Sequence, residues 1–135
     1  VNNLFEYPIF TAYGNQEWLT DESGTILNWT VDNYFYEGKR ESSFLGENVT
    51  KYHKTITTYI NDLLKCGFVI KEVIESTPPK EMIDEVEGMK DELRRPMMLL
   101  ISAKKQGTQS EEKSYIIKKY KFLYNILANY YETSK

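Results

Sequence analysis

The segment Met97–Lys104 (MMLLISAK) constrains the fold most strongly, because it is almost continuously apolar. It follows Pro96, and proline is tolerated at the start of a strand, where no ladder hydrogen bond is needed from it. A strand with one face in water alternates apolar and polar residues, whereas a continuous apolar run indicates a strand covered on both faces. The sequence therefore predicts a sheet in which both faces of this strand are buried.

Three further segments are predicted to be strands. Asn3–Tyr7 is rich in apolar residues and is followed by Pro8, which ends a strand. Thr25–Val31 alternates apolar and polar residues, the period of a half-buried strand. Phe68–Glu75 is rich in branched side chains and lies between Gly67 and two prolines. Together with the helices described next, these strands predict an α+β fold for the isolated chain.

The segment Lys51–Cys66 is predicted to be a helix, because its apolar residues recur at steps of three and four. Asn48 or Thr50 can cap its first turn. A short helix is expected after Pro79, and residues 14–24, 32–47 and 90–95 are predicted to be loops. The aromatic side chains of residues 32–47 are expected to anchor that loop to the rest of the protein, as in many functional loops.

Residues 110–135 are predicted to form an extra amphipathic helix, joined by a linker at 106–109 to a domain that spans 1–105. The apolar positions of this helix cover more than one face, so it must be buried on more than one side. We therefore expect a homo-oligomer; the alternative is that the helix folds back over its own chain. The residues expected at the interface are Ile116, Tyr120, Leu123, Leu127 and Tyr130.

The chain has 135 residues, of which 41% are hydrophobic and 27% charged, and this is the composition of one globular domain. A net charge of −3 provides no basic surface, so no nucleic-acid partner is expected. The longest apolar run, Met97–Ile101, is far shorter than the about 20 residues of a membrane span, so no membrane partner is expected. Cys66 is the only cysteine; this excludes an internal disulfide and, without a secretion signal, favours the cytoplasm. One histidine and one cysteine also argue against a metal site.

Candidate functional residues gather between residues 32 and 53. His53 could donate a hydrogen bond in a substrate pocket or act as a general base, or it could be a polar residue at the edge of an apolar stripe. A cluster around it could line a pocket for a small substrate, or form a solvated loop with internal salt bridges. The cluster consists of Asp32, Tyr34, Glu37, Arg40 and Glu47.

Arg94 and Arg95 are a second candidate. Two adjacent guanidinium groups could hold an anionic group, or they could pair with Asp91 and Glu92 in the same segment. The sequence leaves both interpretations open.

Four stretches, taken in this order, resemble the C-terminal portion of bacterial class I S-adenosylmethionine-dependent methyltransferases of the broad methyltransferase-domain type. The resemblance covers about residues 4–105. The stretches are YPIFTA (7–12), GTILNWTVDNYFYEGKR (24–40), FLGENVTKYHKTITTYINDLLKCGF (44–68) and DELRRPMMLLISAKK (91–105).

The resemblance implies part of a doubly wound α/β sheet, mainly parallel, with an antiparallel last strand and donor binding at the carboxyl ends of the strands. Asn3–Tyr7 would be its fourth strand and residues 51–66 its last crossover helix. Phe68–Glu75 and Met97–Lys104 would be the final two strands, paired as an antiparallel hairpin.

The resemblance also implies a site. His53 would be the catalytic residue, and Tyr34, Phe35, Glu37, Arg40 and Tyr52 would bind the substrate, a small-molecule acceptor. Tyr7 and Pro8 would lie near the methyl donor, where relatives commonly have His-Pro.

The donor-binding loop of the family is not found in this sequence, because none of the seven glycines forms a Gly-rich phosphate or nucleotide loop. S-adenosylmethionine is therefore the cofactor of the full-length family, and we expect this chain alone not to bind it tightly and to be inactive. The chain begins with Val1, so we expect either a start codon read as valine or an upstream, N-terminal half that binds the donor. One rival is a non-catalytic interaction or dimerisation module. Another is a standalone ligand pocket among Trp18, Trp29 and Tyr34.

Overall fold

The main sheet of the computed structural model, which describes residues 1–106, has three strands in the order β1-β7-β6. These are β1 (Asn2–Glu6), β7 (Met98–Lys105) and β6 (Phe68–Glu75), and β7 is antiparallel to both of its neighbours. β7 is the central strand, and five of its eight residues, Met98–Ile101 and Ala103, are buried, which confirms the prediction that it is covered on both faces. Four residues of β7 are exposed by 1% or less: Leu99, Leu100, Ile101 and Ala103.

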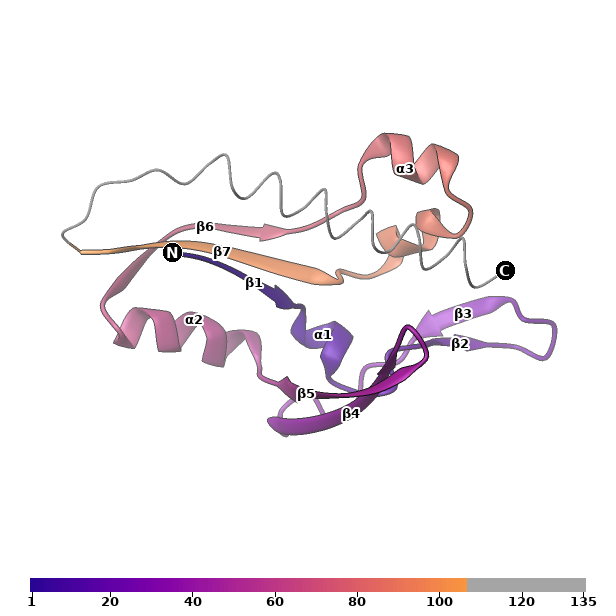
Figure 1. Ribbon diagram of the computed structural model, residues 1–135, viewed down its shortest axis with the longest axis horizontal. Helices are drawn as coiled ribbons and strands as arrows, with labels where there is room; N and C mark the ends of the chain where they lie inside the picture. Colours follow the sequence, from indigo (N-terminus) through magenta and orange to yellow (C-terminus); the bar gives the residue numbers. More distant parts are fainter. Residues whose placement is uncertain (107–135) are drawn as a thin grey trace.

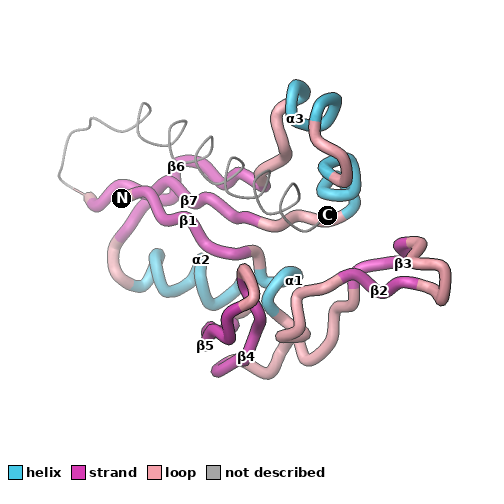
Figure 2. The backbone as a smooth tube through the Cα atoms, turned by 45° about the vertical axis from the view of Figure 1, so that its right-hand side comes forward, coloured by secondary structure: helices cyan, strands magenta, loops and turns pink. Residues whose placement is uncertain are grey.

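One face of this sheet is covered by α2 (Ile56–Lys65), which precedes β6 (Figures 1 and 2). The rings of Phe5 and Tyr59 lie 4.1 Å apart between β1 and this helix. The helix begins later than predicted, with Thr55 as its N-cap: the Thr55 hydroxyl accepts a hydrogen bond from the Thr58 amide at 3.2 Å. The prediction of a start at Lys51 was wrong, because residues 47–53 pair as a strand instead.

A short helix, α1 (Pro8–Thr11), follows β1, and two antiparallel hairpins separate it from α2. The first hairpin pairs β2 (Trp18–Thr20) with β3 (Ile26–Trp29). The second pairs β4 (Gly38–Phe44) with β5 (Glu47–His53). The predicted loop over 14–24 therefore contains a strand, and so does the predicted loop over 32–47.

The β4–β5 hairpin was not predicted from the sequence, because most of the residues on its inward face are polar. Gly38 pairs with His53, Arg40 with Lys51 and Ser42 with Val49, and it is this face of the two strands that is turned away from solvent. The turn is Leu45-Gly46, and both residues have positive φ values, of 51° and 82°. Such a turn matches the twist of a two-residue hairpin, and glycine adopts it without the strain of a side chain.

The connection from β6 to β7 consists of α3 (Lys80–Glu85) and the short 3₁₀ helix η1 (Met89–Arg94). The helix predicted after the prolines is confirmed, and the loop predicted over 90–95 is mostly η1. β6 and β7 pair antiparallel as expected, although two helical segments join them instead of a tight turn. β1, the predicted fourth strand, pairs directly with the last strand.

Both hairpins lie past the carboxyl end of β1, on the side where the chain enters α1 (Figure 1). Among residues 1–106, no helix has the length and apolar character needed to cross a membrane. Apart from Gln106, the predicted linker and the predicted helix over 110–135, with its proposed interface residues, fall outside the part of the chain that the structure describes.

Candidate functional site

The carboxyl end of β1 is fixed by Tyr7 and Pro8. The Tyr7 amide donates to the Met97 carbonyl at 2.7 Å, and its hydroxyl donates to a Glu75 carboxylate oxygen at 2.5 Å. Burial, together with this hydrogen bond to the nearby carboxylate, raises the pKa of Tyr7 to about 12. Pro8 is fully buried at the start of α1. Both residues predicted to lie near the donor are therefore at a strand end, and the Tyr7 hydroxyl is bonded within the chain.

His53 is completely buried at the end of β5 and contacts two other segments. Its Nε2 lies 2.7 Å from the Tyr34 carbonyl oxygen, and its Nδ1 lies 2.7 Å from the Thr11 hydroxyl. A carbonyl can only accept, so Nε2 carries a proton and donates it; in the neutral ring, Nδ1 then accepts from Thr11. The His53 ring thus connects β5, α1 and the segment that contains Tyr34, and both of its nitrogens are engaged in hydrogen bonds within this chain.

Glu37 and Tyr34 lie at the N-terminus of α2. A carboxylate oxygen of Glu37 accepts from the Thr55 amide at 2.8 Å and from the Thr55 hydroxyl at 3.0 Å. The Tyr34 hydroxyl accepts from the Ile56 amide at 3.2 Å. These contacts satisfy amides that a helix cannot pair internally, and the negative charge suits the positive end of the helix dipole. Hydrogen bonds from Thr58 and Thr55 lower the pKa of Glu37.

Replacing Glu37 with glutamine is expected to reduce the loss of unfolding free energy that the protein shows as the pH is lowered. A carboxyl group whose pKa is lowered by folding stabilises the protein fully above its ordinary pKa, near 4.5, and loses that contribution as the pH falls through the lowered value. Urea unfolding at pH 7 and below pH 4.5 measures this difference. Glu85→Gln on α3 is the control, and an equal pH dependence in wild type and Glu37→Gln would contradict the capping role.

Arg40 ties the same loop to α1. Its Nε donates to the Ala12 carbonyl at 2.8 Å, and its Nη2 donates to the carbonyls of Tyr36 at 2.6 Å and Asn33 at 3.2 Å. The Arg40 guanidinium therefore holds the backbone of the 33–36 loop in place.

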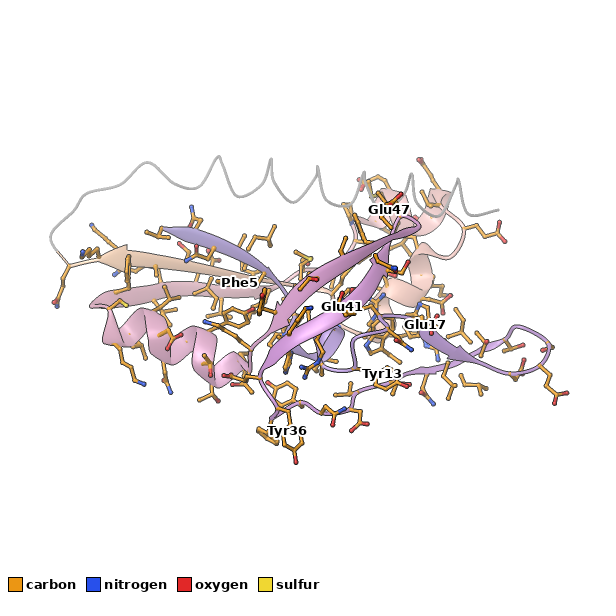
Figure 3. All side chains as sticks on the ribbon, turned by 60° about the horizontal axis from the view of Figure 1, so that its bottom comes forward. Phe5, Tyr13, Glu17, Tyr36, Glu41 and Glu47 are labelled. Atoms are coloured by element: carbon orange, nitrogen blue, oxygen red, sulfur yellow. The ribbon has the colours of Figure 1, made fainter. Side chains whose placement is uncertain are left out.

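The predicted site residues fall into two groups. Tyr34, Glu37, Arg40 and His53 are connected by the contacts above. Phe35 and Tyr52 are instead exposed by 86% and 69% and take no part in these hydrogen bonds, although the Phe35 ring lies edge-on to the Tyr34 ring at 5.2 Å. Tyr36, in the same loop as Phe35, projects away from the body of the protein (Figure 3).

A contact that sequence reasoning missed joins the β4–β5 hairpin to β1. The Lys51 ammonium lies 2.6 Å from the Glu6 carboxylate and donates to the Gln16 side-chain carbonyl at 2.7 Å. Ser42 donates to the same Gln16 oxygen at 2.7 Å. Lys51 and Glu6 are 45 positions apart in the sequence, so no local pattern could indicate their pairing.

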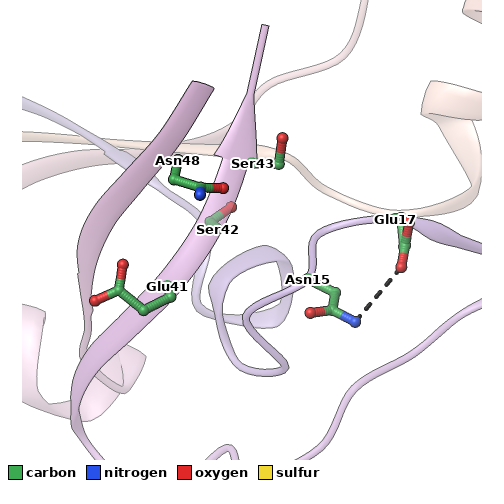
Figure 4. Close-up of a pocket in the computed structure, with 6 residues that line it drawn as sticks. All are labelled: Asn15, Glu17, Glu41, Ser42, Ser43 and Asn48. Carbon is green, nitrogen blue, oxygen red and sulfur yellow. Dashed lines mark hydrogen bonds between the residues drawn. The ribbon is translucent and has the colours of Figure 1, made fainter. Parts of the chain in front are cut away.

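Two hollows lie beside these elements. The polar hollow, of about 420 Å³, has two glutamates and no basic residue in its wall (Figure 4). The aromatic hollow, of about 310 Å³, has two tryptophans and two arginines and no acidic residue. The polar hollow is lined by Asn15, Glu17, Glu41, Ser42, Ser43 and Asn48. The aromatic hollow is lined by Ile9, Trp18, Asn28, Trp29, Val31, Arg94, Arg95 and Pro96.

Arg94 and Arg95 pair with Asp91 and Glu92, which is one of the two interpretations that the sequence allows. Arg95 makes two hydrogen bonds, of 2.7 and 3.0 Å, to the Glu92 carboxylate, and the side chains are 6% and 1% exposed. Arg94 contacts Asp91 at 3.1 Å and is more exposed. The Arg95 guanidinium carbon also lies over three aromatic rings, a cation–π arrangement. These are Trp29 at 4.2 Å, Trp18 at 4.8 Å and Phe10 at 4.8 Å.

The chain is similar to solved structures of methyltransferases. One is a protein from Listeria monocytogenes assigned as an S-adenosylmethionine-dependent methyltransferase; it is 57% identical, has a TM-score of 0.72, and the match covers 78% of this chain and 47% of that chain. Another is an S-adenosylmethionine-dependent methyltransferase from Mesorhizobium loti, 36% identical with a TM-score of 0.65, for which the coverage is 76% and 46%.

A curated relative, an uncharacterized protein of Haemophilus influenzae, is 30% identical over 104 residues, which are 74% of this chain and 39% of the relative. No family model matches the sequence. The chain spans less than half the length of each of these relatives. By sequence and by fold, the chain corresponds to part of an S-adenosylmethionine-dependent methyltransferase domain, which confirms the resemblance.

Proposed function

We propose that the chain is the C-terminal, acceptor-facing part of an S-adenosylmethionine-dependent methyltransferase that works in the bacterial cytoplasm. The observation that carries this proposal is the position of the two hairpins past the carboxyl end of β1 (Figure 1). Doubly wound sheets bind their ligands at the carboxyl ends of their strands. Segments inserted at that edge can therefore orient an acceptor and exclude water, and methyl transfer depends on both.

The described residues do not form a complete donor site. The sequence has no Gly-rich loop, and the Tyr7 hydroxyl is bonded to Glu75. β1 pairs with one strand, β7, in the described sheet, so its other edge is suited to receive a further strand. We infer that the donor-binding half is supplied by residues outside this chain, in keeping with solved relatives of which the match covers only 47% and 46%.

In this proposal, some candidate residues hold the 33–37 loop in position and others contact the acceptor or the donor-binding half. Glu37, Arg40 and His53 bond the 33–37 loop to α1 and α2, so they hold the loop in position for an acceptor. Phe35 and Tyr52 present exposed aromatic rings that can contact the acceptor or the donor-binding half. The predicted homo-oligomer stays a prediction, and nothing in residues 1–106 favours the alternative of a non-catalytic interaction module.

Calorimetric titration of S-adenosylmethionine tests the missing donor site. The 135-residue chain alone is expected to give no saturable heat at micromolar donor, because its sequence contains no Gly-rich loop of the kind that holds such ligands. Micromolar binding with one site per chain would contradict the proposal.

A further inference from the structure

The aromatic hollow has the composition of a small-ligand pocket. Its apolar walls consist of two indole rings, whose centroids are 5.2 Å apart and whose planes are nearly perpendicular, and of aliphatic side chains. Its volume of about 310 Å³ is at the lower end of the range that small-molecule sites occupy. The hollow includes Ile9, which directly follows Pro8, so it opens beside the carboxyl end of β1.

The polar side chains of this hollow are Arg94, Arg95 and Asn28, and all three carry N–H donors. Arg95 is 8% exposed, yet its Nε has no hydrogen-bond partner among the described residues. A buried N–H group without an acceptor is destabilising, and an oxygen of a ligand would relieve this. Arg94 and the Asn28 amide line the same hollow, and no acidic side chain does. Both guanidinium groups already pair with Asp91 and Glu92, so the donor that remains is the Arg95 Nε, and an acceptor oxygen is favoured there over a cation.

We propose that the aromatic hollow binds a small planar aromatic carboxylate, with its ring against Trp18 and Trp29 and its carboxylate toward the two arginines. Indole rings favour flat aromatic partners, and guanidinium groups bind carboxylates through charge-assisted hydrogen bonds. The hollow lies where the proposed function requires an acceptor, so the inference, which rests on that function, assigns the acceptor to aromatic acids.

The two tryptophans of the chain both line the hollow, so their indole N–H signals in a ¹H–¹⁵N NMR spectrum report on it directly. Titration of the full 135-residue chain with 2-naphthoate is expected to shift both signals saturably. The neutral 2-naphthamide is expected to bind at least about tenfold more weakly, because it lacks the charge that strengthens a hydrogen bond to guanidinium. No saturable shift with naphthoate, or equal binding of the amide, would overturn the proposal.

A pair of matched variants tests the position of the charge. Asn28→Asp adds a negative charge to the aromatic hollow and is expected to weaken naphthoate binding at least about fivefold. Asn48→Asp makes the same change in the polar hollow and is expected to leave binding within about twofold. Equal weakening by both variants would place the ligand elsewhere and overturn the proposal. The donor is not used in this experiment, so its failure is distinct from a failure of the proposed function.

Discussion

Replacing Arg95 with methionine is expected to lower the free energy of unfolding by about 3–5 kcal/mol. The substitution leaves the Glu92 carboxylate, whose side chain is 1% exposed, without its two hydrogen bonds from the guanidinium. It also removes the cation from above Phe10, Trp18 and Trp29, which loosens the packing of α1 against the β2–β3 hairpin. Urea or thermal unfolding measures the loss.

Arg94 provides the matched control. It directly precedes Arg95 in the chain and pairs with Asp91, but these side chains are 39% and 32% exposed. Water screens such a pair, so Arg94→Met is expected to lower the free energy of unfolding by at most about 1 kcal/mol. The double variant Arg95→Met/Glu92→Leu is expected to recover most of the stability, since it removes both buried charges. Equal losses in the two single variants would contradict the burial argument.

His53→Ala is expected to lower the free energy of unfolding by about 2–4 kcal/mol. The substitution leaves a cavity where the fully buried ring lies, and it deprives the Tyr34 carbonyl and the Thr11 hydroxyl of their 2.7 Å partner. In an enzyme completed with a donor-binding half, turnover is expected to fall at least about tenfold, because the 33–37 loop loses its anchor.

His53→Gln separates positioning from proton transfer. A glutamine amide can donate to the Tyr34 carbonyl but does not titrate near neutral pH. If His53 positions the loop, this variant recovers much of the lost stability and turnover and leaves the shape of the pH–rate profile unchanged. A turnover as low as that of His53→Ala, with loss of one limb of the profile, would assign a proton-transfer role to His53.

The sheet was predictable because its strands carry their own signals. Continuous apolarity identified β7, and branched residues between Gly67 and the prolines identified β6. The β4–β5 hairpin has no such signal, because Arg40, Ser42 and Lys51 face inward where a half-buried strand ordinarily has apolar residues. The apolar stripe of α2 was found, but its start was placed too early because the sequence does not show that residues 47–53 pair with β4.

The sequence predicted which residues lie near one another in the candidate site, but not which atoms they contact. The sequence grouped Asp32, Tyr34, Glu37, Arg40 and Glu47 beside His53. The structure connects Tyr34, Glu37 and Arg40 with His53 but leaves Asp32 and Glu47 exposed. The sequence did not indicate their partners, because most of these are backbone groups such as the Ala12 carbonyl and the Thr55 amide. Contacts of this kind depend on tertiary structure and leave no trace in local spacing.

The most direct test of the account compares donor binding by the chain alone with binding by a completed domain. The completed domain joins the chain to the part of the Listeria monocytogenes protein that the chain does not match, since the matched parts are 57% identical. Calorimetry is expected to show one S-adenosylmethionine site per joined chain and binding at least about a hundredfold weaker, a difference of about 2.7 kcal/mol, for the 135-residue chain alone. Equal affinity of the two proteins for S-adenosylmethionine would contradict the account.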